Sequence, residues 1–282
     1  MLTLDAAYVR AALPRRDTQG HKGDFGKVYV LGGSVGYTGA PVFCSRAAVR
    51  TGCGLVFLGV PAGIWQVAAV KSDEAMPHPL PSLDGRLSLA ADVRLRAAGC
   101  DAVAMGCGMG RGAESDALVR RLLTLEQPLV LDADGINALE RHIDELSLRR
   151  GLVTVLTPHE GEFFRAGGDV SRGRESGAAA YAARRGVYLV LKGHRTVIAA
   201  PDGRLAVNTT GNDGMAKGGS GDILTGMTAS LLAQGMAPFD ACCCAVWLHG
   251  RAGDLAAAEK GRRGMTPTDL LEKLPYALKE VE

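Results

Sequence analysis

Asn208–Gly226 reads N-T-T-G-N-D-G-M-A-K-G-G-S-G-D-I-L-T-G, a stretch in which six glycines stand close to one aspartate that opens an apolar helical run. Glycines let the backbone approach a ligand closely, and a helix that begins near Asp222 directs its unpaired N–H groups and positive dipole end toward that ligand. The alternative is that the glycines form a turn and Asp222 only caps the helix Ile223–Gln234. One turn does not require six glycines, so the stretch predicts an anion-binding loop, with phosphate as the first candidate.

The composition predicts one globular α/β unit over residues 1–282. The 282 residues are 47% hydrophobic and 22% charged, which is enough for one large core. A formal charge of +2 is too small to indicate a nucleic-acid or membrane partner, so we expect small ligands. Seven cysteines without a C-x-x-C pair predict buried free thiols rather than zinc ligands. The N-terminus lacks a secretory pattern and no apolar run reaches about 18 residues, which predicts a cytoplasmic protein.

Short β-rich runs alternate with amphipathic or Ala-rich runs, separated by glycine or proline. The first four runs are Val28–Leu31, Ala40–Arg50, Leu55–Val60 and Ile64–Ala69. Further strands are expected at Ala102–Met105, Leu129–Asp132, Thr154–Thr157, Val187–Lys192, Thr196–Ala200 and Leu205–Asn208, and helices near Ser115–Leu123, Gly173–Arg185, Asp222–Gln234, Pro238–Glu259 and Pro267–Leu274. This rhythm, with continuously apolar strands, indicates a mostly parallel central sheet covered by helices on both faces. The turn chemistry of Ala199–Gly203 predicts an antiparallel pair late in the sheet.

Ligands of open α/β sheets bind at the carboxyl ends of the strands, so the loops there indicate function. Gly32–Pro41 and Met105–Arg111 are glycine-rich and could lie against a planar ligand or an anion, although a plain strand-to-helix turn explains the first equally well. Neither matches a Walker A loop or a dinucleotide fingerprint. Val155–Phe163 offers His159 as a candidate substrate contact and Glu162 as a candidate outer-sphere ligand of Mg²⁺. A lone histidine is more often structural, so His159 depends on its neighbours.

Two more loops carry charged side chains at strand ends. Leu129–Leu139 places Asp132 and Asp134 where carboxylates can hold hydrated Mg²⁺ or a substrate hydroxyl, unless Asp134 only caps the next helix. Lys192–Thr196 is a basic turn that could meet nucleotide phosphates. A surface turn between strands is equally plausible for this segment.

Taken together, these segments resemble the NAD(P)H-hydrate dehydratase family. The motifs appear in the matching order as H-K-G-D-F-G-K-V, G-G-S-x-G-Y-T-G-A-P, G-C-G-M-G, D-A-D-G-I-N-A-L, T-P-H-x-G-E-F, L-K-G-H-R-T and the Asn208–Gly226 stretch. W-L-H-G-R-A-G-D at Trp247–Asp254 and G-M-T-P-T-D-L-L at Gly264–Leu271 extend the resemblance almost to the C-terminus. The resemblance implies a ribokinase-like fold.

The same resemblance implies repair of damaged nicotinamide cofactors. The S form of hydrated NADH or NADPH (NADHX or NADPHX) would be dehydrated at the expense of a nucleotide. Bacterial-type members use ADP, which gives AMP and phosphate, and eukaryotic members use ATP; the K-G-G-S-G-D motif and the compact length of this chain favour ADP. The resemblance implies Mg²⁺ and a homo-oligomer, most simply a homotetramer. Because the dehydratase-like sequence begins within about two dozen residues of Met1, no epimerase domain is expected.

The family comparison also implies roles for individual residues. Asp222 would be the general base on the ring hydroxyl as that group attacks the terminal phosphate of the nucleotide. The departure from an N-x-x-E motif at His159 leaves the metal ligands open. The resemblance implies that the hydrated cofactor contacts Ala40, Gly108, His159 and Asp222. It implies that the nucleotide contacts Lys192, Gly193, His194, Arg195, Thr196 and Gly221, and that Gly219, Ser220 and Gly221 form the anion hole. Glu162 would bind Mg²⁺ through water.

Two other functions are compatible with parts of this pattern. A ribokinase-like, ATP-dependent kinase of a small vitamin precursor would use the same aspartate and glycines, and would leave a stable phosphoester. A catalytically silent nucleotide sensor would not need to retain Asp222 and Glu162. The G-Y-T-G-A-P and T-P-H-x-G-E-F loops favour the dehydratase.

Overall fold

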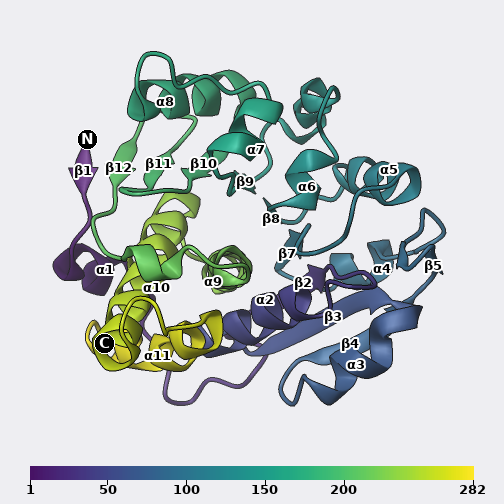
Figure 1. The fold of residues 1–282 in the computed structure, drawn as a ribbon, viewed down its shortest axis with the longest axis horizontal. Helices are drawn as coiled ribbons and strands as arrows, with labels where there is room; N and C mark the ends of the chain where they lie inside the picture. The colour runs from purple at the N-terminus through teal and green to yellow at the C-terminus, as the bar shows by residue number, and fades with distance from the viewer.

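The computed structural model describes all 282 residues and is built around one ten-stranded sheet (Figure 1). The strand order is β1-β12-β11-β10-β9-β8-β7-β2-β3-β4. The bounds are β1 Leu2–Thr3, β2 Lys27–Leu31, β3 Leu55–Pro61, β4 Met76–Leu80, β7 Ala102–Met105, β8 Leu129–Leu131, β9 Thr154–Leu156, β10 Tyr188–Leu191, β11 Val197–Ala199 and β12 Leu205–Val207. A separate two-stranded ribbon joins β5 (Ser82–Leu83) to β6 (Arg86–Leu87).

Helices cover both faces of this sheet. Helices α2, α9, α10 and α11 pack on one face, and α5, α6, α7 and α8 lie on the other (Figure 1). The bounds are α1 Ala6–Ala12, α2 Gly39–Arg50, α3 Trp65–Val70, α4 Arg94–Ala98, α5 Ala113–Leu122, α6 Asp134–Asn137, α7 Glu160–Arg165, α8 Arg174–Arg185, α9 Ser220–Ala233, α10 Pro238–Lys260 and α11 Pro267–Lys279, with short 3₁₀ segments at Ala62–Ile64, Ile143–Arg149 and Asp213–Met215. None of the helices combines the length and apolar character needed to cross a membrane.

Two hydrophobic cores form because neighbouring residues of each strand point to opposite faces. In β2, Val28 and Val30 enter the core under α2, α9 and α10, whereas Tyr29 and Leu31 enter the core under α5 to α8. Strands buried on both sides need apolar residues at every position, which is why these strands read as continuous apolar runs in the sequence. All seven cysteines are free and buried, as predicted.

The predicted architecture is confirmed, including the antiparallel element. Strand β11 runs antiparallel to both β10 and β12, and the other sheet pairings are parallel. Edge strand β4 was not predicted, because Pro77 and Pro79 argue against a strand. Proline is tolerated there because β4 has a neighbour on one side only, where it pairs with β3. The sheet therefore extends one strand further beyond β3 than the sequence pattern indicates.

Candidate active site

The loops singled out in the sequence meet at the carboxyl ends of the parallel strands. The amide of Gly33, after β2, donates to the carbonyl of Cys107, after β7, over 2.9 Å. The amide of Lys192, after β10, donates to the carbonyl of Pro158, after β9, over 2.8 Å. Helix α9 begins at the same edge, because Lys192 also lies next to Gly221 in its first turn. One edge of the sheet thus gathers glycine loops, charged side chains and a helix N-terminus.

Helix α9 begins at Ser220, and Gly219 is its N-cap, so the alternative in which Asp222 caps the helix is wrong. Gly219 has φ +110°, a left-handed conformation that favours glycine. The amide of Ser220 donates to the carbonyl of Lys217, but the amides of Gly219, Gly221 and Asp222 have no acceptor within the chain. These free N–H groups, at the positive end of a 14-residue helix, can bind an anion.

Asp222 lies in the first turn of α9 and is partly buried. A carboxylate oxygen of Asp222, one of Asp132 and the sulfur of Cys107 all lie within 4.8 Å of one another. Burial and then the negative charge of Asp132 raise the pKa of Asp222 to about 7, although Cys107 and Lys192 act in the opposite direction. A carboxyl group with such a pKa can take up a proton near neutral pH, as a general base must.

Asp132 is held by hydrogen bonds from within the protein. It follows β8, is 1% exposed, and accepts hydrogen bonds from Lys192 Nζ over 2.7 Å and from Thr225 Oγ1 over 2.8 Å. Burial alone would raise the pKa of Asp132, but the charge of Lys192 and the hydrogen bonds to it keep that pKa below its usual value. Each carboxylate oxygen of Asp132 thus accepts one hydrogen bond from within the protein, and these bonds fix the orientation of the carboxylate.

Asp134 is not a helix cap, because Ala133 precedes α6 as its N-cap and Asp134 is the first residue of the helix. Its Oδ2 instead accepts from the amide of Gly110 over 2.8 Å, which ties the loop after β7 to the loop after β8. Ala133, between the two aspartates, has φ +46° and ψ −114°, a strained conformation for a residue with a side chain. The D-A-D segment is thus fixed in a shape that the surrounding loops impose.

Ala40 and Gly108 lie against each other, as a shared pocket wall requires. Gly108 has φ +63°, and a Cβ added to it would lie 2.9 Å from the Cβ of Ala40 and 3.0 Å from that of Tyr37. Ser34 Oγ donates to the carbonyl of Gly108 over 2.8 Å and fixes this loop. The glycine-rich loops after β2 and β7 therefore form one continuous surface.

His159 is the N-cap of α7. Its Nδ1 accepts from the amides of Gly161 and Glu162, and Glu162 Oε2 accepts from the amide of His159 over 2.9 Å, which completes a capping box. The ring is still 55% exposed, and Glu162 is buried with its Oε2 3.8 Å from Lys192 Nζ. A contact of the exposed ring with substrate stays a prediction.

The basic turn after β10 is held by Arg174, the first residue of α8. Its guanidinium donates to four carbonyl oxygens along the turn, those of Leu191, Lys192, His194 and Arg195. Arg174 Nε also lies 2.8 Å from Glu160 Oε1, at the start of α7. The side chain of Lys192 points inward to Asp132, so the turn offers its backbone, rather than this ammonium group, to a ligand.

Sequence reasoning missed the function of α10, which holds the glycine-rich stretch in place. Asp254 accepts from the amide of Gly211 and from the side chain of Asn212, and Thr210 donates to the carbonyl of Trp247. His249 Nε2 lies 2.8 Å from the carbonyl of Ser220. Burial lowers the pKa of His249 to about 4, so its ring is neutral at physiological pH. Polar residues on a long, otherwise apolar helix were the available signal.

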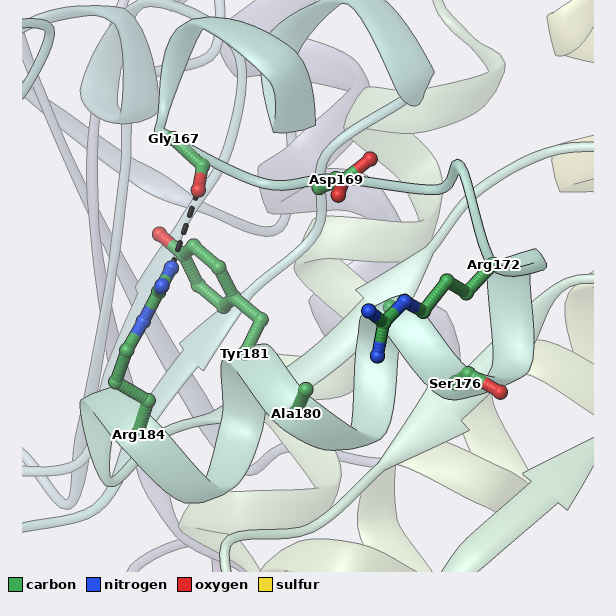
Figure 2. A pocket seen from close by; sticks show the side chains of 8 residues that line it. Gly167, Asp169, Arg172, Ser176, Ala180, Tyr181 and Arg184 are labelled. Carbon is green, nitrogen blue, oxygen red and sulfur yellow. Dashed lines mark hydrogen bonds between the residues drawn. The ribbon is translucent and has the colours of Figure 1, made fainter.

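A cavity of about 500 Å³ lies elsewhere, between α8 and the loop before it (Figure 2). Asp169 accepts from the amide and hydroxyl of Ser171, and Arg184 donates to the carbonyl of Gly167. These charged groups are thus engaged with the protein itself, and no predicted site residue lines the cavity. Its lining residues are Gly167, Asp169, Arg172, Ser176, Gly177, Ala180, Tyr181 and Arg184.

Comparison with known proteins gives a consistent result. Residues 28–276 match the model of the NAD(P)H-hydrate dehydratase family. The chain is 45% identical over 287 residues to the bifunctional NAD(P)H-hydrate repair enzyme of Moorella thermoacetica, with 99% of this chain and 54% of that protein covered. It is 35% identical to the ADP-dependent (S)-NAD(P)H-hydrate dehydratase of Bacillus subtilis, with 98% and 97% covered. The chain thus spans about half the length of the bifunctional relatives.

Solved structures agree with the sequence matches. A crystal structure of the ADP/ATP-dependent NAD(P)H-hydrate dehydratase from B. subtilis, co-crystallised with ATP and Mg²⁺, superposes with a TM-score of 0.83 at 31% identity and covers 100% of this chain and 99% of that one. A ribokinase-like superfamily protein from Enterococcus faecalis superposes with a TM-score of 0.84 at 26% identity, covering 99% and 96%. The fold is therefore ribokinase-like.

Proposed function

This chain belongs to the NAD(P)H-hydrate dehydratase family, and from that premise we propose that it dehydrates the S form of hydrated NADH and NADPH at the expense of ADP, giving AMP and phosphate. The observation that carries the proposal is the position of Asp222. It lies in the first turn of α9, beside amides that have no acceptor, and its pKa is raised to about 7. One place thus combines a base with a binding site for the phosphate.

Asp222 removes the proton of the hydroxyl group on the hydrated nicotinamide ring. The oxygen of that hydroxyl attacks the terminal phosphorus of ADP at the same time. A new P–O bond forms, the bond from that phosphorus to the bridging oxygen breaks, and AMP leaves. The phosphate group is then expelled from the ring carbon with the C–O electron pair, driven by the lone pair of the ring nitrogen. Loss of a proton from the adjacent ring carbon restores the double bond of the reduced nicotinamide.

The glycine-rich start of α9 stabilises the charge that develops on the transferring phosphate. The free amides of Gly219, Gly221 and Asp222 are oriented before any ligand arrives, and hydrogen bonds of this kind act most strongly where charge appears in the transition state. The amide of Ser220 donates to the carbonyl of Lys217, so Ser220 shapes the turn but offers no free donor to the phosphate. The anion hole is therefore made of backbone donors.

The loops around α9 divide between the two substrates. The surface formed by Ala40 and Gly108, with the exposed ring of His159, faces the hydrated nicotinamide. The turn Lys192–Thr196, held rigid by Arg174, and Gly221 contact the nucleotide.

Glu162 is the residue that we assign to Mg²⁺, through water. Glu162 accepts from the amide of His159 and lies near Lys192, so its carboxylate is already held by protein groups. Glu162 would therefore hold the ion by way of water molecules bound to it. When bound, Mg²⁺ neutralises charge on the nucleotide phosphates. The family premise further supports a homotetramer that acts in the cytoplasm.

The test supplies the purified protein with hydrated NADH, Mg²⁺ and either ADP or ATP, and follows recovery of the near-ultraviolet absorbance of the reduced nicotinamide. We expect recovery with ADP. Asp222→Asn should lower turnover at least about a hundredfold while nucleotide affinity stays within about threefold, because the base is lost and the amides remain. Asp213→Asn, at an exposed position of the same stretch, is the matched control and should keep normal turnover.

Two results would contradict the proposal. Absence of recovery with either nucleotide, together with formation of a stable phosphoester on a hydroxylated vitamin precursor, would show a kinase instead. Near-normal turnover of Asp222→Asn would show that the base lies elsewhere.

A further inference from the structure

The active site holds more negative than positive side chains. The carboxylates of Asp132 and Glu162 lie beside a single ammonium group, that of Lys192, and the carboxylate of Asp222 lies next to that of Asp132. Lys192 Nζ lies 2.7 Å from Asp132 Oδ1 and 3.8 Å from Glu162 Oε2. One cation cannot balance three carboxylates, so a cluster of this kind retains a proton on its least stabilised member.

The hydrogen bonds decide which carboxylate stays ionised. Asp132 accepts from Lys192 and from Thr225, and its side chain is almost completely buried. Thr225 lies three residues after Asp222 on the same helix, so one hydrogen bond fixes Asp132 relative to the first turn of α9. Asp222 has no such cationic partner. Asp132 is thus a fixed negative charge at the side of Asp222.

We propose that Asp132 is a positioning residue whose carboxylate, kept ionised by Lys192, strengthens Asp222 as a proton acceptor. Its charge lies close to Asp222 in a partly dry site, where it disfavours the ionised form of its neighbour. Only the catalytic use of Asp222 as a base rests on the proposed function. The effect of Asp132 on the protonation of Asp222 rests on the positions of the two carboxylates and Lys192.

Other groups that face Asp222 do not remove this effect. Cys107 adjoins it from the loop after β7, Asp134 adds a more distant negative charge from α6, and Lys192 adds a positive charge from the end of β10. The ammonium group of Lys192 is bonded to Asp132, so its attraction for Asp222 is offset by the nearer partner. The positive end of α9 also favours an ionised Asp222. Replacing Asp132 by a neutral residue should therefore favour ionisation of Asp222 strongly.

The experiment measures the protonation of Asp222 directly, without substrate or nucleotide. Protein labelled with carbon-13 at the aspartate carboxyl groups is titrated by NMR, and the Asp222 resonance is identified by its absence in Asp222→Asn. In the native protein the midpoint should lie near neutral pH. In Asp132→Asn it should fall by about one to two pH units, because the amide keeps the shape of the side chain and removes its charge.

Thr225→Val is the matched control, because it removes the hydrogen bond to Asp132 and keeps the charge. Its midpoint should stay within about 0.3 pH units of the native value. An unchanged midpoint in Asp132→Asn, or an equal shift in Thr225→Val, would overturn the inference. If Asp132→Asn does not fold, the native protein still decides, because an Asp222 midpoint near 4 contradicts the inference. Since no turnover is measured, failure of the dehydratase proposal leaves this test intact.

Discussion

Asp132 and Asp222 are carboxylates of the same site whose pKa values are displaced in opposite directions. Lys192 and Thr225 hold the pKa of Asp132 below its usual value, whereas burial and the charge of Asp132 raise that of Asp222 to about 7. Above about pH 7, Asp222 is ionised even though burial and the charge of Asp132 disfavour its negative charge. At the scale of single residues, the proposed base is therefore held ionised at a cost to stability.

Asp222→Asn should stabilise the fold at alkaline pH. Between its unfolded pKa of about 4 and its folded pKa of about 7, Asp222 binds more protons in the folded state, so the stability it contributes is lost as pH rises through this window. The variant should therefore gain about 1–3 kcal/mol in free energy of unfolding at about pH 8, and less than half of that at about pH 5. Urea unfolding at both pH values measures this.

The control for that measurement is Asp213→Asn, because Asp213 is exposed in the same stretch. It should change stability by less than about 0.5 kcal/mol at either pH. A gain in Asp222→Asn that did not depend on pH would assign the effect to something other than the ionisation of this carboxyl group.

At the scale of elements, α2 and α9 pack so closely that glycine decides their separation. A Cβ added to Gly226, in the middle of α9, would lie 1.9 Å from the carbonyl oxygen of Cys44 in α2. Helix propensity alone would favour alanine at this position by about 1 kcal/mol. The glycine is therefore explained by packing, which brings the helix carrying Asp222 against the helix that follows the first glycine-rich loop.

Gly226→Ala should lower the free energy of unfolding by about 2–4 kcal/mol despite its better helix propensity, because one of the two helices must move. Gly218→Ala is the matched control, since a Cβ there has no neighbour within 4 Å. It should change stability by less than about 1 kcal/mol. Chemical denaturation measures both variants, and a Gly226→Ala protein as stable as the native one would refute the packing argument.

At the scale of the whole molecule, two cores share one set of strands. Trp247 lies in the core under α9 and α10, and Trp65 packs against that core. Arg149, 1% exposed, lies on the other side, where it donates to Thr154 Oγ1 and to the carbonyls of Leu123, Leu125, Gln127 and Val153. Because β8 and β9 contribute residues to both cores, we expect the two faces to unfold together.

Arg149→Met should destabilise both faces together. Loss of the guanidinium leaves buried carbonyl oxygens without donors, and the expected loss is about 3–5 kcal/mol. Tryptophan fluorescence, which reports the opposite core, should shift to the same lower denaturant midpoint as the far-ultraviolet circular dichroism. Arg150→Met, at the exposed neighbouring position, should leave both midpoints unchanged. Separate midpoints for the two signals in Arg149→Met would show that the cores unfold independently.

The sequence was sufficient for elements whose pattern is local. Strands such as Val28–Leu31 and Ala102–Met105 were predicted because burial on both faces makes them continuously apolar. Strand β4 was not, because its prolines fit only an edge that the sequence cannot identify. The start of α9 was placed two residues too late, because its cap is the backbone of Gly219 in a left-handed conformation and no side chain marks it.

Pairings between distant residues were beyond such reasoning. Lys192 reads as part of a basic surface turn, yet its ammonium group contacts Asp132, which lies 60 positions away in the sequence. The sequence placed both residues at strand ends, and the strand order then determined that they meet. The hydrogen bonds that α10 makes through His249, which donates to the carbonyl of Ser220, and through Asp254, which accepts from Gly211 and Asn212, were missed for the same reason.

Helix α10 supplies none of the free amides at the start of α9, yet its side chains fix the stretch that leads to them. The conformational entropy of that stretch is therefore lost when the chain folds, and an arriving anion does not have to order it. If this site binds phosphate as proposed, its affinity is linked to the integrity of α10, whose side chains hold the preceding stretch. Mutations of Asp254 that leave the fold intact should weaken anion binding, because the stretch would then be more mobile in the unliganded protein and binding would have to order it.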